Sequence, residues 1–169
     1  MSPAKEKNNS GNEENHPLDN ILNAAQKIFG QYGLDKTTMN DIAKEIGMSK
    51  AFLYYYFPNK EKLFEAVVKK EQREFVNEIN EIIKKNLKAE VVLHEYLKKR
   101  QTVFLDFLNL SKLKYYSMIK EKPCIGKLHD AFRKQEIELI EQILKTGIHS
   151  KEFRMTKTKE YAELFISTM

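Results

Sequence analysis

Apolar side chains recur at helical spacing along most of the chain after residue 17. Ile21, Ala25 and Ile28 fall at i, i+4 and i+7, which predicts an amphipathic helix that Gly33 ends. The same spacing predicts seven further helices, at about 38–46, 50–57, 60–87, 90–109, 111–121, 125–147 and from 157 onward. No segment alternates apolar and polar residues as a strand does. We therefore expect an all-α chain of eight helices.

The two ends of the chain differ from its middle. Residues 1–16, MSPAKEKNNSGNEENH, are polar and charged, and we expect them to form a disordered tail. The last predicted helix includes KEYAELFISTM and stops at residue 169 without a cap or a polar tail. We expect this C-terminal helix to be truncated and the natural protein to be longer.

Composition narrows the classes of protein that fit. The 169 residues carry a formal net charge of +5, but residues 17–66 hold six basic and six acidic side chains. If that region binds nucleic acid, a few placed cations must do so rather than bulk charge. The single cysteine, Cys124, excludes an intrachain disulfide framework. No apolar run approaches the ~18–20 residues that span a bilayer, and no secretion signal is present, so we expect a soluble cytoplasmic protein with no membrane partner.

Two short helices joined by a glycine-containing turn lie between residues 38 and 57. Thr38 is placed to cap the first of them, with Asp41 three residues later as in a capping box. Gly47 ends that helix and Ser49 is placed to cap the next one. This pattern is typical of a helix-turn-helix, in which the second helix enters the DNA major groove.

Helical geometry separates the faces of that second helix. With Leu53 at zero and a step of about 100° per residue, Phe57 lies on the same side, at about 40°. Ala51 and Tyr55 fall at about 160° and 200°, so they must point outward. Tyr56, at about 300°, falls on the inward side with Leu53 and Phe57, whereas Tyr54 and Phe52 lie on the flanks, at about 100° and 260°. Exposed rings with hydroxyls can touch thymine methyl groups and donate to phosphate oxygens. The alternative roles for the tyrosines are core packing, above all for Tyr56, and a protein–protein contact.

Residues 18–66 resemble the N-terminal domain of the TetR family of bacterial transcriptional regulators. The family patterns T-x-x-x-I-A-x-x-x-G and S-x-x-x-L-Y-x-Y-F-x-x-K-E-x-L are met from Thr38 to Gly47 and from Ser49 to Leu63. The resemblance implies a helix-turn-helix DNA-binding domain at 17–62 and a larger helical domain at 63–169 for ligand binding and dimerisation. The candidate DNA contacts are Thr37, Thr38, Ser49, Lys50, Ala51, Phe52, Tyr54, Tyr55, Tyr56 and Lys60.

Two of those positions depart from common family usage. Ala51 stands where Gly is frequent, and Phe52 stands where a small polar residue often reads a base. A phenyl ring can contact a thymine methyl group but cannot form a hydrogen bond with a base edge.

For Lys60, the resemblance implies a contact that anchors a DNA phosphate.

The second domain carries no recognisable catalytic chemistry. Its histidines have no paired spacing with cysteine or carboxylates, so we expect no metal site and no cofactor. Aromatic and methionine side chains there form core or line an apolar effector cavity. The candidate ligand contacts are Phe104, Phe107, Tyr115, Met118 and Phe132.

These patterns favour a transcriptional repressor that binds a palindromic operator as a homodimer and responds to a small-molecule effector. An enzyme is disfavoured, since no paired carboxylates and no nucleophile constellation are present. A helical protein–protein adaptor that uses the aromatic face is the alternative.

Overall fold

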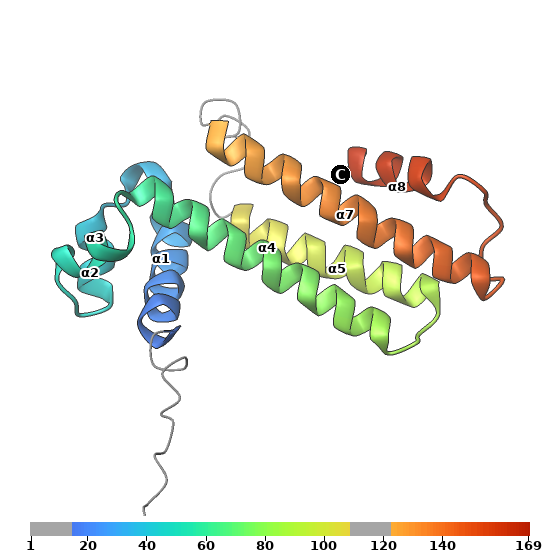
Figure 1. Ribbon diagram of the computed structural model, residues 1–169, viewed down its shortest axis with the longest axis horizontal. Helices are drawn as coiled ribbons and strands as arrows, with labels where there is room; N and C mark the ends of the chain where they lie inside the picture. The colour runs from blue at the N-terminus through green and yellow to red at the C-terminus, as the bar shows by residue number, and fades with distance from the viewer. Residues whose placement is uncertain (1–14, 109–122) are drawn as a thin grey trace, which may run out of the picture. The chain divides into compact units, whose positions relative to one another are not determined.

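The computed structural model describes the backbone of residues 15–108 and 123–169, and the side chains of 17–102 and 125–169. Within these ranges the chain forms seven α-helices and no strand, which confirms the all-α prediction (Figure 1). The chain divides into two compact units, Met1–Val67 and Val68–Met169. Several predictions lie outside the described residues: the helix 111–121, the tail up to residue 14, and the side chains of Phe104, Phe107, Tyr115, Met118 and Cys124.

The first unit contains α1 (Asn15–Lys36), α2 (Met39–Glu45), α3 (Lys50–Tyr56) and the first turns of α4 (Lys60–Lys84). α2 packs against both α1 and α3. One face of α1 supplies much of the core, and the Phe29 ring meets Phe64 of α4 edge-on, with 5.1 Å between ring centroids. Because α1 begins at Asn15, the prediction that Asn15 and His16 belong to a disordered tail is wrong.

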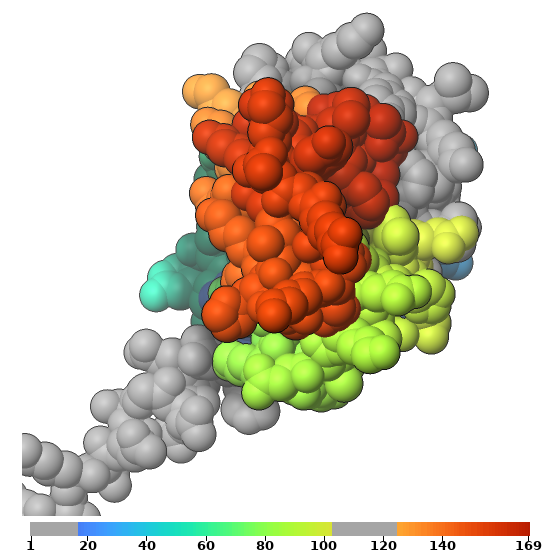
Figure 2. Space-filling view, turned by 90° about the vertical axis from the view of Figure 1, so that its right-hand side faces the viewer, coloured from blue at the N-terminus to red at the C-terminus, as the bar shows by residue number. Residues whose placement is uncertain are grey.

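The second unit contains the rest of α4 together with α5 (Ala89–Leu108), α7 (Pro123–His149) and α8 (Thr158–Ser167). α7 packs against α5 and α8, and α8 lies on the surface beside it (Figure 2). The shared core is built from Phe75, Ile79, Ala89, Val92, Tyr96, Leu139, Ile140, Ile143, Leu144, Ala162 and Ile166. Long amphipathic helices thus bury one stripe each, as the spacing of apolar residues predicts.

Gly147 has a different role from the one its position suggests. The sequence places it at the end of a helix, but α7 continues to His149. A Cβ atom at Gly147 would lie 2.3 Å from the ring of Phe153 and 2.9 Å from the Cβ of Ala89. The glycine therefore permits a close approach of the α7–α8 connection and of α5.

Gly147→Ala is expected to lower the free energy of unfolding by about 1–3 kcal/mol, because overpacking outweighs the better helix propensity of alanine. The matched control is Gly30→Ala in α1, where an added Cβ meets nothing within 4 Å. That variant is expected to gain up to ~1 kcal/mol. Chemical denaturation of both variants measures the difference, and equal gains at the two positions would contradict the packing argument.

Candidate nucleic-acid interface

The start of α2 is fixed by a capping box. The Thr38 hydroxyl accepts a hydrogen bond from the Asp41 N–H at 3.2 Å, and Asp41 Oδ2 accepts from the Thr38 N–H at 2.9 Å. The Thr38 hydroxyl also donates to Asp41 Oδ2 at 2.7 Å. These hydrogen bonds, first that of the hydroxyl and then that of the backbone, lower the pKa of Asp41. The predicted capping box is confirmed, and a phosphate would have to compete with Asp41 for the single hydroxyl hydrogen of Thr38.

α3 presents two opposite faces, as its geometry predicts. Ser49 caps the helix, and its Oγ accepts from the Phe52 N–H at 3.2 Å. Leu53 is fully buried, whereas the Tyr55 side of the helix faces out and Tyr55 is 83% exposed. Lys50, Ala51 and Tyr54 are exposed as well. The outer face of α3 is therefore free to meet a partner.

The aromatic side chains on α3 form an ordered cluster that the sequence does not reveal. The Phe52 ring packs edge-on against Tyr56, and Tyr56 packs edge-on against Tyr55, with 5.1 Å between centroids in both pairs. On another side of the helix, the Lys50 ammonium lies 5.6 Å from the centre of the Tyr54 ring. Contacts of these kinds restrain side chains that are otherwise free to change rotamer. We call Phe52, Tyr55 and Tyr56 the aromatic cluster.

Thr37 is not part of this surface. It is 1% exposed, and its hydroxyl donates to the carbonyl of Gly33 at 2.7 Å. The backbone N–H of Thr37 donates to the same carbonyl. The structure therefore removes Thr37 from the predicted DNA contacts, because both of its donors are engaged inside the first unit.

Lys60 makes contacts of an unexpected kind. Its ammonium donates to the carbonyls of Leu34, Asp35 and Thr37, at 2.9, 3.2 and 3.1 Å. Next to it, Asn59 caps α4, since its Oδ1 accepts a hydrogen bond from the Lys62 N–H at 2.8 Å. Lys60 is thus held at the first turn of α4 with all three ammonium hydrogens directed at backbone oxygens.

A buried polar group links α5 to α7 in the second unit. Glu136 is 2% exposed and accepts from the Tyr96 hydroxyl and the Arg100 Nε, both at 2.6 Å. Burial first, and then the carboxylate, raise the pKa of Tyr96 far above its ordinary value, so the hydroxyl keeps its proton. Burial alone would lower the pKa of the Arg100 guanidinium, but the hydrogen bond and the negative charge of Glu136 outweigh burial and raise it. We call these three residues the buried triad.

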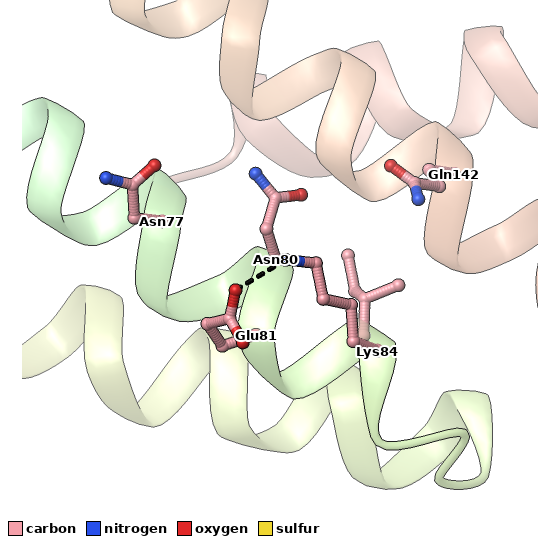
Figure 3. Close-up of a pocket in the computed structure, with 6 residues that line it drawn as sticks. Asn77, Asn80, Glu81, Lys84 and Gln142 are labelled. Atoms are coloured by element: carbon pink, nitrogen blue, oxygen red, sulfur yellow. Dashed lines mark hydrogen bonds and ion pairs between the residues drawn. The ribbon is translucent and has the colours of Figure 1, made fainter.

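An open groove lies between α4 and α7 in the second unit. It is polar, with the carboxamides of Asn77 and Asn80 on α4 facing Gln142 on α7 (Figure 3). Lys84 and Glu81 also line it and form an exposed ion pair, with 2.6 Å between Nζ and Oε1. The predicted ligand contact Phe132 is not among the lining residues. It packs against the core, with 5.6 Å between the ring centroids of Phe132 and Phe75. A role for Phe132 in effector binding stays a prediction.

Two absences hold for the described ranges. Their His, Cys, Asp and Glu side chains form no group of three placed to hold a metal ion. None of the helices described is both long and apolar enough to cross a membrane.

A capped two-helix motif with an exposed second helix defines the class as a helix-turn-helix transcriptional regulator. A family model described as "Bacterial regulatory proteins, tetR family" matches residues 21–67. A solved transcriptional regulator from Cytophaga hutchinsonii is 45% identical, covers 90% of this chain and 77% of its own, and superposes with a TM-score of 0.82. The chain belongs to the TetR family of bacterial transcriptional regulators.

Two further relatives extend the comparison. The biofilm operon regulator IcaR of Staphylococcus aureus (strain Newman), a negative transcriptional regulator, is 43% identical over 51 residues. That match covers 30% of this chain and only 27% of the length of IcaR. FadR of Bacillus subtilis, solved in complex with stearoyl-CoA, is 22% identical with a TM-score of 0.72 and covers 89% of this chain and 81% of its own. The FadR likeness shows the fold alone.

Proposed function

We propose that this protein is a cytoplasmic repressor that binds a palindromic DNA operator as a homodimer and releases it when a small effector binds. The observation that carries the proposal is the outer face of α3, where Tyr55 is exposed opposite the buried Leu53. A helix that buries one side in its own unit and presents rings and a cation on the other suits the major groove. The proposed contacts are Thr38, Ser49, Lys50, Ala51, Phe52, Tyr54, Tyr55 and Tyr56.

Dimerisation is supported by the surface of α8. Leu164 is 61% exposed, and Tyr161 on the same helix is half exposed. Apolar side chains of this size, grouped on one helix, favour burial against another protein surface. A second copy of this chain would also supply the second recognition helix that a palindrome requires.

Effector control is supported by the family fold and by FadR, which was solved with stearoyl-CoA. In the proposed mechanism the effector binds the second unit and favours a state in which the two recognition helices no longer match successive grooves. DNA affinity falls only as far as the effector discriminates between the two states.

Fluorescence anisotropy with DNA from upstream of the protein's own gene tests the proposed function. Tight binding that survives an excess of unrelated competitor DNA is the expected result. Analytical ultracentrifugation should give a complex whose mass corresponds to two protein chains bound to one DNA duplex. Equal affinity for both DNAs would contradict operator recognition and would favour the adaptor alternative, in which the aromatic face meets a protein.

Phe52 is expected to contact a thymine methyl group in each half-site. Replacing the thymine of one half-site by uracil removes one methyl group, which is worth about 0.8 kcal/mol when buried, or a loss of about fourfold in affinity. In a Phe52→Ala variant the same replacement should change affinity very little, because the ring that covers the methyl group is gone. A full fourfold loss in the variant would place the methyl contact on another residue.

A further inference from the structure

α1 has a kink at Gly33, and residues 33–38, which we call the α1–α2 turn, connect its regular part to α2. Gly33 adopts φ 78° and ψ 164°, which breaks the regular path of α1. A positive φ of this size suits glycine, because other residues meet a steric penalty there. Carbonyl groups beyond the last regular turn of a helix lack intrahelical partners and need other donors.

Lys60 supplies those donors. Its ammonium reaches the carbonyls of Leu34, Asp35 and Thr37 within 3.2 Å. An ammonium has three hydrogens and can take three separate directions, whereas the planar guanidinium of arginine offers a fixed fork. The ammonium lies at the C-terminal end of α1, where the helix dipole also favours a positive charge. The arrangement suits lysine in particular.

We propose that Lys60 is a positioning residue that ties the α1–α2 turn to the start of α4, rather than a phosphate contact. This inference rests on the proposed function for its meaning in DNA binding. It replaces the phosphate role that the resemblance implies, because a phosphate would have to displace at least one of three charge-assisted hydrogen bonds.

The position of the turn explains why this tie matters for recognition. Thr37 lies buried beside Gly33, and the next residue, Thr38, caps α2. α2 in turn packs against α3, which carries the aromatic cluster. A turn released from Lys60 would let the start of α2 shift, and the outer face of α3 would shift with it.

The two roles make opposite predictions for a Lys60→Met variant of the full chain. Loss of a positioning residue should lower the melting temperature by about 4 °C or more. It should also speed amide hydrogen exchange at residues 34–38, and weaken DNA binding without changing the salt dependence. Loss of a phosphate contact should leave melting and exchange unchanged and reduce the slope of log K against log salt by about 0.9.

Lys50→Met is the matched control, since Lys50 is exposed at the start of α3 and is a proposed DNA contact. We expect it to reduce the salt slope by about 0.9 with an unchanged melting temperature. A Lys60→Arg variant should restore the charge but not the melting temperature, because a guanidinium cannot reach three diverging carbonyls. Full recovery by arginine, or an unchanged melting temperature in Lys60→Met, would overturn the inference.

The readouts also separate this inference from the proposed function. If the unaltered protein binds no DNA, the operator proposal fails, while melting temperature and hydrogen exchange still decide the role of Lys60. If DNA binds and Lys60→Met changes only the salt slope, the positioning role fails and the operator proposal stands.

Discussion

Glu136→Ala is expected to lower the free energy of unfolding by about 3 kcal/mol. Removal of one partner from a buried ion pair leaves an uncompensated charge, which commonly costs about 3–5 kcal/mol. The lower end of that range applies here because the side chain of Arg100 is 24% exposed to solvent, so its charge can be hydrated by water. The hydroxyl of Tyr96, by contrast, is left in the core without its acceptor. Urea denaturation monitored by circular dichroism measures the change.

Two further variants make that result specific to the buried triad. Glu138→Ala changes an exposed carboxylate two residues away on the same helix and should stay within about 0.5 kcal/mol of the unaltered protein. Replacing the whole triad by apolar residues, as Tyr96→Phe, Arg100→Met and Glu136→Leu together, should recover much of the loss. If Glu136→Ala were as mild as Glu138→Ala, the triad would not hold α5 and α7 together.

Tyr55→Ala is expected to weaken operator binding by about tenfold or more, equivalent to about 1.4 kcal/mol, without lowering the melting temperature. Tyr55 is the most exposed of the large apolar or aromatic side chains described, so its removal takes little from the folded state. The substitution should remove both the proposed DNA contact of Tyr55 and the edge-on contact that its ring makes with Tyr56. Anisotropy titration and thermal unfolding of the same preparation give the two values.

Tyr32→Ala provides the comparison for that experiment. Tyr32 is half exposed on α1, in the same unit, and the change removes the same side chain. Operator affinity should stay within about twofold. An equal loss from both variants would show that the effect comes from general surface change, and an unchanged affinity in Tyr55→Ala would remove the role of the outer face of α3.

The two faces of α3 could be predicted from the sequence because a fixed angular step decides which side each residue takes. Leu53 and Phe57 are buried and Tyr55 is exposed, in agreement with that step. The caps Thr38 and Ser49 could also be predicted, since a cap interacts with residues only three positions away. Local geometry determines both features, so the order of residues along the chain is sufficient to predict them.

The structure differs from the sequence-based expectation where contacts join distant residues. Lys60 meets carbonyls 23 to 26 residues earlier, and their orientation depends on the backbone of Gly33. Glu136 meets Tyr96 and Arg100, 40 and 36 residues earlier, so its pattern along α7 alone resembles that of a surface carboxylate. No local signal in the sequence marks such tertiary partners.

Selection of bound DNA from a random pool decides whether this protein recognises a palindromic operator. We expect an enriched sequence with two inverted half-sites whose centres lie about 34–36 Å apart, or a multiple of that distance. We also expect a thymine at one fixed position in each half-site, opposite Phe52. A pool that shows no enriched sequence after repeated rounds would contradict operator recognition, because an operator-binding regulator must favour its own site.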